Sequence, residues 1–396
     1  MSEEQPADDP IGASATALAV ELVAIDSVNP GLVPGAAGES HIVQHLQARL
    51  DAAGFTTEVL VPDGHPDRPS LLAITPHAPA SRAGPTVVLT GHLDTVGTNG
   101  MSEPLAARVE GHRLLGRGAC DMKGGIAAMV AAAEELARTE LTGRVVLALV
   151  ADEEDLSIGT EAVIAALPGL GVRPDVAVVG EPTWLALARS LRGYAVVEVA
   201  LTGRSAHSSQ PEQGVNAVAH LGRLLAAVEA RGGEIASGGG SLMATVAGGG
   251  ESPFVLARSA RVVIERRTVP GESADVALTE VQALLTEMRA VDPTVDASAR
   301  LLVSREAWRL EDVGPAATLG DRLTAALGEA APTEPFHAPY WMEAPLWQAA
   351  GIPALVCGPA GGGLHAADEW VDLRQVRRYA VALTTAVREW VTEHAH

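Results

Sequence analysis

His92 and Asp94 have the residue types and the spacing of a metal ligand and its supporting acid. They follow the apolar run 85–90, which predicts a buried strand with both side chains at its C-terminal end. Open α/β sheets place their functional groups at this end. Alternation along the backbone sends both side chains to one side, which suits an imidazole that binds a metal while a carboxylate holds its other nitrogen.

Three further apolar runs lead to acids or to a histidine in the same way. These are 144–151 before Asp152, Glu153, Glu154 and Asp155, 175–180 before Glu181, and 353–359, followed by a glycine loop, before His365. Four consecutive acids after so apolar a strand would be crowded, and crowding of this kind is costly unless cations neutralise it. The alternative for the four acids is a hydrated loop. The repetition predicts a metal centre at one edge of a sheet.

Asp121 lies in the glycine-rich stretch 114–125, directly before a predicted helix over 126–136. At this junction between a loop and a helix, its carboxylate is either another metal ligand or an N-cap. The glycines do not form a phosphate-binding motif, because neither G-x-x-x-x-G-K-[ST] nor G-x-G-x-x-G is present. Other predicted elements of this part are helices 13–25 and 39–53 and strands 56–60 and 71–74.

The segment 191–304 has a different pattern. Its predicted elements are the strands 194–201, 241–247, 260–268 and 295–303 and the helices 214–230 and 272–289. Their β-α-β-β-α-β order is that of a ferredoxin-like unit. We therefore expect an α/β catalytic domain formed by 1–190 and 305–396, with 191–304 inserted as a second domain.

Composition limits the classes of partner and location. The 396 residues contain 28 basic and 49 acidic side chains, a formal net charge of −21, which argues against nucleic acid and anionic membranes as partners. Cys120 and Cys357 are too few for a disulfide framework. The N-terminal segment 1–5 is acidic and resembles no signal peptide, and no apolar stretch approaches 18 residues. We expect a soluble, cytoplasmic protein.

Taken together, these motifs resemble those of the M20 metallopeptidase family, which includes deacetylases, desuccinylases, aminoacylases and carboxypeptidases. The matching motifs are Gly91–Val96, Gly116–Gly125, Asp152–Glu154, Gly180–Thr183, Gly203–Pro211, Val269–Glu272 and the His365 loop. The resemblance covers about residues 22–387. It implies a zinc-peptidase-like catalytic domain carrying an inserted ferredoxin-like lid through which two chains form a homodimer.

The resemblance also implies a dinuclear metal centre. Asp121 would bridge two divalent ions, with His92 and Glu181 completing one site and Glu154 and His365 the other. Two imidazoles and three carboxylates form a donor set suited to Zn²⁺, with Co²⁺ or Mn²⁺ as alternatives.

Three more residues acquire catalytic roles through the resemblance. Glu153 would act as the general base, and Asp94 would hold His92 in its ligating tautomer. His207, in the insert, would reach the active site of the partner chain and stabilise the tetrahedral oxyanion. A surface histidine in a turn is the alternative for His207.

Substrate contacts are expected from Arg267, Phe254 and Gly363. Arg267 matches the arginine that binds the substrate carboxylate in the family, whereas a surface ion pair with Glu265 is the alternative. Phe254 stands where relatives often have an asparagine, and Gly363 belongs to the His365 loop. With Tyr340 and Trp341, Phe254 suggests a more apolar pocket, unless these aromatic residues are part of the core.

The expected function is hydrolysis of the amide bond of an N-acyl amino acid or a related N-acyl amine by a metal-activated water. A dipeptidase or carboxypeptidase acting on a short peptide is the alternative within the same chemistry. A non-catalytic binding protein would be expected to lack a ligand or the base, yet His92, Asp121, Glu153, Glu154, Glu181 and His365 are all present.

Overall fold

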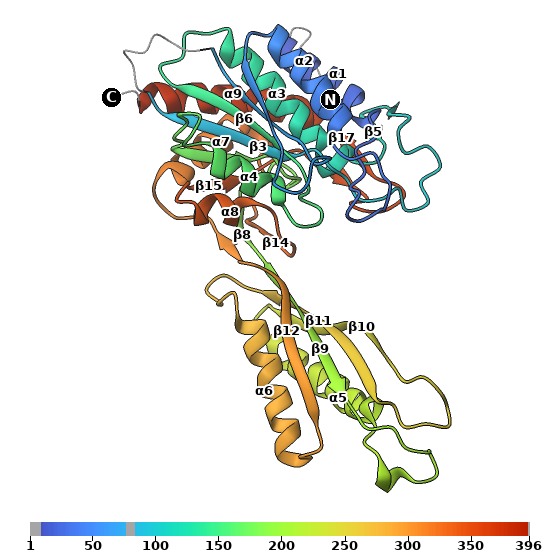
Figure 1. Ribbon diagram of the computed structural model, residues 1–396. Coiled ribbons are helices and arrows are strands. Elements are labelled where there is room, and N and C mark those ends of the chain that lie inside the picture. Colours follow the sequence, from blue (N-terminus) through green and yellow to red (C-terminus); the bar gives the residue numbers. More distant parts are fainter. Residues whose placement is uncertain (1–8, 77–83, 395–396) are drawn as a thin grey trace. The chain divides into compact units, whose positions relative to one another are not determined.

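The computed structural model describes residues 9–76 and 84–394 (Figure 1). The N-terminal segment 1–5, used above to predict the location of the protein, lies outside the described residues. The chain divides into two compact units. Unit 1 contains the described residues up to Arg189, Leu310–His337 and those from Met342 onward, and unit 2 contains Ser190–Arg309 and Ala338–Trp341.

A six-stranded sheet forms the centre of unit 1. Its order is β1 (Thr56–Leu60), β2 (Ser70–Ile74), β6 (Arg144–Val150), β3 (Thr86–His92), β7 (Val176–Val179) and β15 (Ala354–Val356). The strands β6, β3, β7 and β15 are parallel, whereas β1 and β2 pair antiparallel. The prediction of an α/β fold is confirmed, and four parallel strands end at one edge of the sheet.

Helices cover this sheet. They are α1 (Pro10–Val23), α2 (Ser40–Ala52), α3 (Gly124–Ala137), α4 (Ile158–Ala166), α7 (Pro315–Leu327), α8 (Ala344–Ala349) and α9 (Leu373–Glu393). Figure 1 shows α3 and α9 on one side of β3 and β6, with α4 and α8 on the other. Because both faces are covered, β3 is buried along its whole length, which explains its unbroken apolar run.

A smaller sheet brings together two loops that lie far apart in the sequence. Its order is β16 (Gly361–Gly362), β17 (Trp370–Asp372), β5 (Arg113–Leu115) and β4 (Arg108–Glu110). The loop containing His365 connects β16 to β17, and β5 leads into the irregular turn Ala119–Lys123 that contains Asp121. Pairing of β17 with β5 therefore places the Asp121 turn beside the His365 loop.

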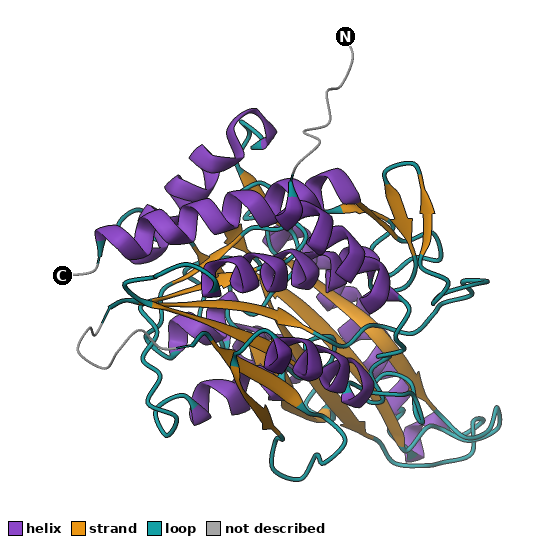
Figure 2. Ribbon diagram, turned by 90° about the horizontal axis from the view of Figure 1, so that it is seen from above, coloured by secondary structure: helices purple, strands orange, loops and turns teal. Residues whose placement is uncertain are grey.

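Unit 2 has the β-α-β-β-α-β order predicted from the sequence. Its elements are β9 (Gly193–Thr202), α5 (Ala217–Ala236), β10 (Ser241–Gly249), β11 (Ser259–Thr268), α6 (Val276–Val291) and β12 (Asp296–Arg305). The antiparallel sheet has the order β10-β11-β9-β12. Apolar side chains of β9, β11, α5 and α6 form a common core, so alternate residues of β9 are buried. Figure 2 shows the helices in purple and the strands in orange.

Three short strands contain residues at which the chain passes from one unit to the other. They are β13 (Trp308–Arg309), β8 (Ala188–Leu191) and β14 (Phe336–Ala338), paired in the order β13-β8-β14. Residues 338–341 belong to unit 2, although the sequence placed them in the catalytic domain. The Trp341 ring meets the Tyr194 ring edge-on, with 6.0 Å between centroids, and this contact accounts for the difference. Within the described residues, no helix is long and apolar enough to cross a membrane.

Candidate metal centre

Asp121 occupies the centre of a cluster of imidazoles and carboxylates in unit 1. Its Oδ1 lies 3.0 Å from His92 Nε2, and its Oδ2 lies 3.3 Å from His365 Nε2. The two oxygens of one carboxylate therefore face two different histidines. This is the arrangement that a carboxylate shared by two cations requires.

The other predicted ligands complete the cluster. Glu181 Oε1 lies 3.7 Å from His92 Nε2, and Glu154 Oε2 lies 3.1 Å from His365 Nε2. Potential ligand atoms of His92, Glu153 and Glu181 lie within 4.8 Å of one another, as do those of His92, Asp121 and Glu154. The structure thus brings together all five predicted ligands and Glu153.

Several carboxylates of the cluster are buried close to one another, and this changes their pKa values. Burial raises the pKa of Glu153 well above its ordinary value, and it does the same to Glu181. Asp121 is the exception, because hydrogen bonds from His365 and His92 outweigh its burial and hold its pKa below the usual range. Hydrogen bonds to Asp121 and Glu154 raise the pKa of His365 to about 10. Without cations, the cluster can reduce its repulsion only by binding protons.

The residues present fit divalent cations. Among the described residues, Glu154 Oε1 is buried and has no hydrogen-bond partner, which leaves a lone pair inside the cluster for another electrophile. Two imidazoles and three carboxylates match the nitrogen and oxygen donors that Zn²⁺ accepts. Cations would also favour the ionised carboxylates that burial and mutual repulsion disfavour, so metal and protons compete for the same atoms.

Parallel strand ends place most of these side chains. His92 is the last residue of β3, Glu153 and Glu154 follow the neighbouring β6, and Glu181 follows β7 on the other side. These elements explain why residues almost 90 positions apart in the chain share one edge of the sheet.

A buried carboxylate holds the Asp121 turn. Glu369 accepts hydrogen bonds from the backbone N–H groups of Gly118 (3.0 Å), Cys120 (2.9 Å) and Asp121 (3.1 Å), and from Arg117 Nη1 (2.5 Å). Arg117 Nη2 also donates to the carbonyl of Ala366, the residue after His365 (3.1 Å). The Arg117–Glu369 pair thus joins the Asp121 turn to the His365 loop.

Replacing Glu369 by glutamine should lower the free energy of unfolding of the metal-free protein by about 3–5 kcal/mol, because Arg117 would remain buried without its counter-charge. A glutamine would also place N–H donors against the backbone donors of the turn. Urea unfolding measures the loss. The matched control is Glu135→Gln, which removes a surface pair with Arg138 and should change stability by less than about 1 kcal/mol. Equal small losses in both variants would contradict this role of Glu369.

Asp94 supports the site in a different way from the one expected. His92 Nδ1 lies 2.9 Å from the backbone carbonyl of Asp94, whereas the Asp94 carboxylate is 3.7 Å away. The carboxylate instead accepts the backbone N–H groups of Glu153 (3.1 Å) and Glu154 (3.2 Å). The backbone carbonyl of Asp94 therefore favours a proton on His92 Nδ1. The other ring nitrogen, Nε2, faces Asp121. The Asp94 side chain therefore binds the backbone of Glu153 and Glu154 instead of the His92 ring.

Gly363 is required by the shape of its loop. Its φ is +70°, and a β-carbon there would lie 2.8 Å from the backbone of Asp368. His365 also has positive φ, +60°, and its carbonyl accepts a hydrogen bond from Asn99 (2.9 Å). These contacts account for Gly363 by backbone geometry, and among the described residues no contact bears on its predicted role in binding substrate.

His207 is exposed in unit 2, and one of its ring nitrogens is held by Ser209. His207 Nδ1 contacts Ser209 through both its hydroxyl (2.7 Å) and its backbone N–H (3.2 Å), which leaves Nε2 on the exposed side of the ring. Phe254 belongs to the neighbouring segment, because its carbonyl accepts the N–H of Ser208 (2.9 Å) and His207 pairs with Val255. Phe254 is 68% exposed, which excludes the alternative of core packing. Trp341, 8% exposed, is part of the core instead.

Arg267 lies at the other end of the unit 2 sheet. It forms an ion pair with Glu265 (2.6 Å) and places its guanidinium 5.3 Å from the centre of the Tyr194 ring. The surface pair that the sequence left open as an alternative is therefore present. From Ser259 to Arg267, β11 rises about 26 Å. Unit 2 does not bring Arg267 together with His207 and Phe254.

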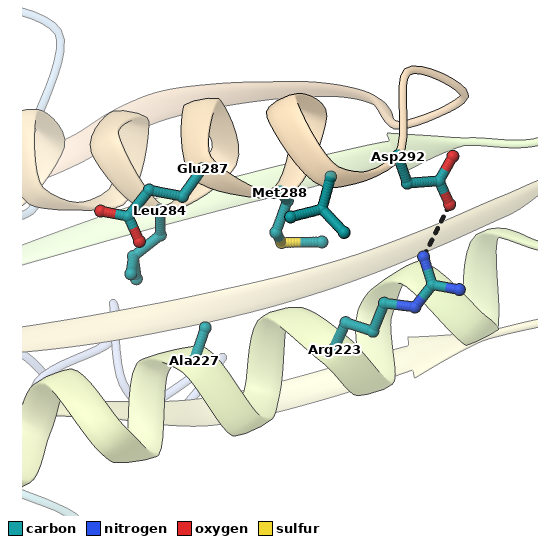
Figure 3. Close-up of a pocket in the computed structure, with 7 residues that line it drawn as sticks. Arg223, Ala227, Leu284, Glu287, Met288 and Asp292 are labelled. Atoms are coloured by element: carbon teal, nitrogen blue, oxygen red, sulfur yellow. Dashed lines mark hydrogen bonds and ion pairs between the residues drawn. The ribbon is translucent and has the colours of Figure 1, made fainter.

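A separate hollow of about 470 Å³ lies between α5 and α6 of unit 2 (Figure 3). Leu284, Met288 and Ala227 line it, and an ion pair between Arg223 and Asp292 (2.6 Å) closes one end. It contains none of the predicted site residues, and we assign it no part in the chemistry.

Sequence reasoning missed several buried polar residues around the centre. Glu343 is 1% exposed, accepts a hydrogen bond from Thr160 (2.6 Å) and adds to the repulsion on Glu153 and Glu181. Others that were missed are Asn29, Glu39, Arg68, Arg117 and Glu369. The one available signal was a charged residue inside an otherwise apolar or glycine-rich motif, as with Arg117 between two glycines.

Comparison with known proteins identifies the family. The profile of peptidase family M20/M25/M40 matches residues 88–389. Acetylornithine deacetylase from Myxococcus xanthus is 30% identical over 382 residues, which cover 93% of this chain and 95% of that protein. The chain belongs to the M20 metallopeptidase family. It is a metal-dependent hydrolase of that family, as the motifs predicted.

Solved structures share the fold. An M20 family metallo-carboxypeptidase from Sulfolobus solfataricus superposes with a TM-score of 0.75 at 14% identity, over 96% of this chain and 99% of that one. A dinuclear metal binding peptidase of the M20 family from Bacillus subtilis gives 0.68 at 15% identity, over the same shares of the two chains.

Proposed function

We propose that this protein hydrolyses the amide bond of an N-acyl amino acid or a related N-acyl amine. The observation that carries the proposal is the position of Asp121, whose two oxygens face His92 and His365 (3.0 and 3.3 Å) with Glu153 beside them. The similarity to an acetylornithine deacetylase over nearly the whole chain supports an acylated amino acid as the substrate.

Two divalent cations would be held by five side chains. Asp121 would be shared, His92 and Glu181 would complete one site, and Glu154 and His365 would complete the other. Zn²⁺ suits this donor set best, with Co²⁺ and Mn²⁺ as alternatives. When bound, the cations would polarise the amide carbonyl and lower the pKa of the attacking water.

Glu153 is the proposed general base. Its backbone N–H is fixed by Asp94, and its carboxylate lies within 4.8 Å of the ligand atoms of His92 and Glu181. Glu153 would take one proton from the attacking water as the new C–O bond forms. It would then deliver that proton to the amine nitrogen as the C–N bond breaks.

The geometry of unit 2 supports a homodimer in which the unit acts as a lid. His207 and Phe254 belong to segments that adjoin the Ser259 end of β11, whereas Arg267 lies about 26 Å along that strand at its other end, a separation longer than one N-acyl amino acid. All three can contact one substrate only if they come from two chains. In that arrangement Arg267 would bind the substrate carboxylate, and His207 of the partner chain would donate its Nε2 proton to the oxyanion.

A mixture of two inactive variants tests this arrangement. His207→Ala and Glu153→Gln should each lose at least about 100-fold in kcat alone, because one removes the oxyanion donor and the other the base. After joint refolding in equal amounts, about a quarter of wild-type activity should return, since half of the dimers contain one intact site. A mixture that stays inactive, although dimers form, would exclude the shared site.

A substrate panel separates the two hydrolytic activities. N-acetyl and N-succinyl amino acids and a matching series of dipeptides are assayed with Zn²⁺, Co²⁺ or Mn²⁺. The proposal predicts higher kcat/KM for the N-acyl series. Preference for dipeptides would instead identify a dipeptidase or carboxypeptidase, and turnover of neither series would contradict the proposal.

We also propose a cytoplasmic location, which the two free buried cysteines support.

A further inference from the structure

A chain of buried polar residues extends away from the proposed catalytic acids. It begins at Asp94, whose carboxylate accepts the backbone N–H groups of Glu153 and Glu154. Both the proposed base and a proposed metal ligand therefore depend on one side chain for the position of their backbone. Asp94 is completely buried.

Asn29 joins Asp94 to a second acid. Its Nδ2 donates to Asp94 Oδ2 (2.8 Å) and to Asp152 Oδ1 (3.1 Å). Its Oδ1 accepts the N–H of Gly31 (2.8 Å), so the amide orientation is fixed. An amide with two donor hydrogens is the neutral group that can hold two neighbouring carboxylates at once.

Arg68 places a positive charge beside Asp152, the second of the two acids that Asn29 joins. Its Nη1 lies 2.7 Å from Asp152 Oδ1, while Nε and Nη2 bind Glu39 in a bidentate pair (2.9 and 2.6 Å). Arg68 is 6% exposed, and Glu39 is completely buried. One planar guanidinium thus holds two carboxylates in fixed positions, whereas an ammonium group carries the same charge without this planar fork.

Asp152 connects this series of polar contacts to Glu153 and Glu154, which directly follow it in the sequence. It has φ +71°, in the left-handed region, and its carbonyl accepts the N–H groups of Leu156 (3.1 Å) and Ser157 (2.5 Å). Residues other than glycine are uncommon in this region, and at Asp152 the hydrogen bonds to its carbonyl and from Asn29 to its carboxylate hold it there. Because Glu153 and Glu154 follow directly, the backbone angles at Asp152 set the direction in which both leave β6.

We propose that Asn29 and Arg68 are positioning residues for amide hydrolysis, with Glu39 orienting Arg68. They hold Asp152 and Asp94, and these two acids set the backbone from which Glu153 and Glu154 reach the metal centre. The inference rests on the proposed function for the roles of those two glutamates. A displacement of about 1 Å at a reacting group can cost about 100-fold in rate, so small changes in this chain should be measurable.

The test compares Asn29→Ala, Arg68→Lys and Arg68→Met with the matched control Arg49→Met. Arg49 forms a similar bidentate pair with Glu134 (2.7 and 2.9 Å) that links α2 to α3, outside this chain of contacts. For each full-length variant, loaded with Co²⁺, one measures kcat, KM, the visible absorption spectrum of the cobalt and the urea midpoint.

Asn29→Ala and Arg68→Lys should lower kcat about 10- to 100-fold, change KM by less than about threefold and alter the cobalt spectrum. Arg68→Lys should recover most of the urea midpoint lost in Arg68→Met without recovering kcat, because it restores the charge but not the planar fork. Arg49→Met should lower the midpoint while kcat and the spectrum stay as in wild type.

Wild-type kcat and an unchanged spectrum in folded Asn29→Ala and Arg68→Lys would overturn the inference. So would recovery of kcat together with the urea midpoint in Arg68→Lys, since a purely structural role predicts that the two recover in parallel. If the wild-type protein itself turns over no substrate, the proposed function fails separately, and the cobalt spectra still report whether Asn29 and Arg68 position the centre.

Discussion

Glutamine in place of Glu153 is expected to lower kcat by about 100- to 10,000-fold while the metal content stays unchanged. Glutamine preserves the volume and the backbone hydrogen bond to Asp94, but its amide cannot accept the proton of the attacking water. KM should change little, because the loss falls on the chemical step.

Glu140→Gln provides the matched control for Glu153→Gln. It neutralises an exposed acid to which we assign no role, so kcat should stay within about twofold of wild type. Steady-state kinetics and metal analysis on the same preparations give the result. Retention of more than about a tenth of wild-type kcat in metal-loaded Glu153→Gln would remove Glu153 from the role of base.

Asparagine in place of Asp121 is expected to abolish binding of both cations and to lower kcat by about 1,000-fold or more. The reason is geometric, since the two carboxylate oxygens face His92 and His365 separately, and an amide offers only one acceptor oxygen. Metal ions contribute several kcal/mol to such reactions, and each 1.36 kcal/mol is a factor of ten in rate.

Metal analysis and circular dichroism of Asp121→Asn distinguish loss of metal from loss of fold. The control is Asp368→Asn, an exposed acid of the His365 loop, which should keep both the metal and the rate. Two tightly bound cations in folded Asp121→Asn would show that Asp121 is not shared between the sites.

The sequence predicted the parallel strands and their functional ends because both are local signals. The run before His92 is apolar because β3 is covered on both faces, and the residue after such a strand lies at the edge of the sheet. The same logic placed Glu154 and Glu181 correctly beside it. Helix ends were less accurate. For example, α1 begins at Pro10, three residues before the predicted start, because Asp9 caps it through the N–H of Gly12.

The supporting contacts could not be predicted in the same way, because they join residues that are distant in the chain. Glu369 holds the Asp121 turn across about 250 residues, and Asn29 meets Asp152 across more than 120. No periodicity or spacing indicates such pairs. The role expected of the Asp94 side chain differed for a related reason, since pattern alone could not distinguish its carboxylate from its carbonyl.

Direct metal counting tests the central claim, that the acids and imidazoles at this sheet edge are arranged around two divalent cations. Purified wild-type protein is equilibrated with Zn²⁺ or Co²⁺, freed of loosely bound metal by gel filtration and analysed by mass spectrometry of the elements. The account predicts about two tightly bound ions per chain. A folded protein that retains no stoichiometric metal would contradict it.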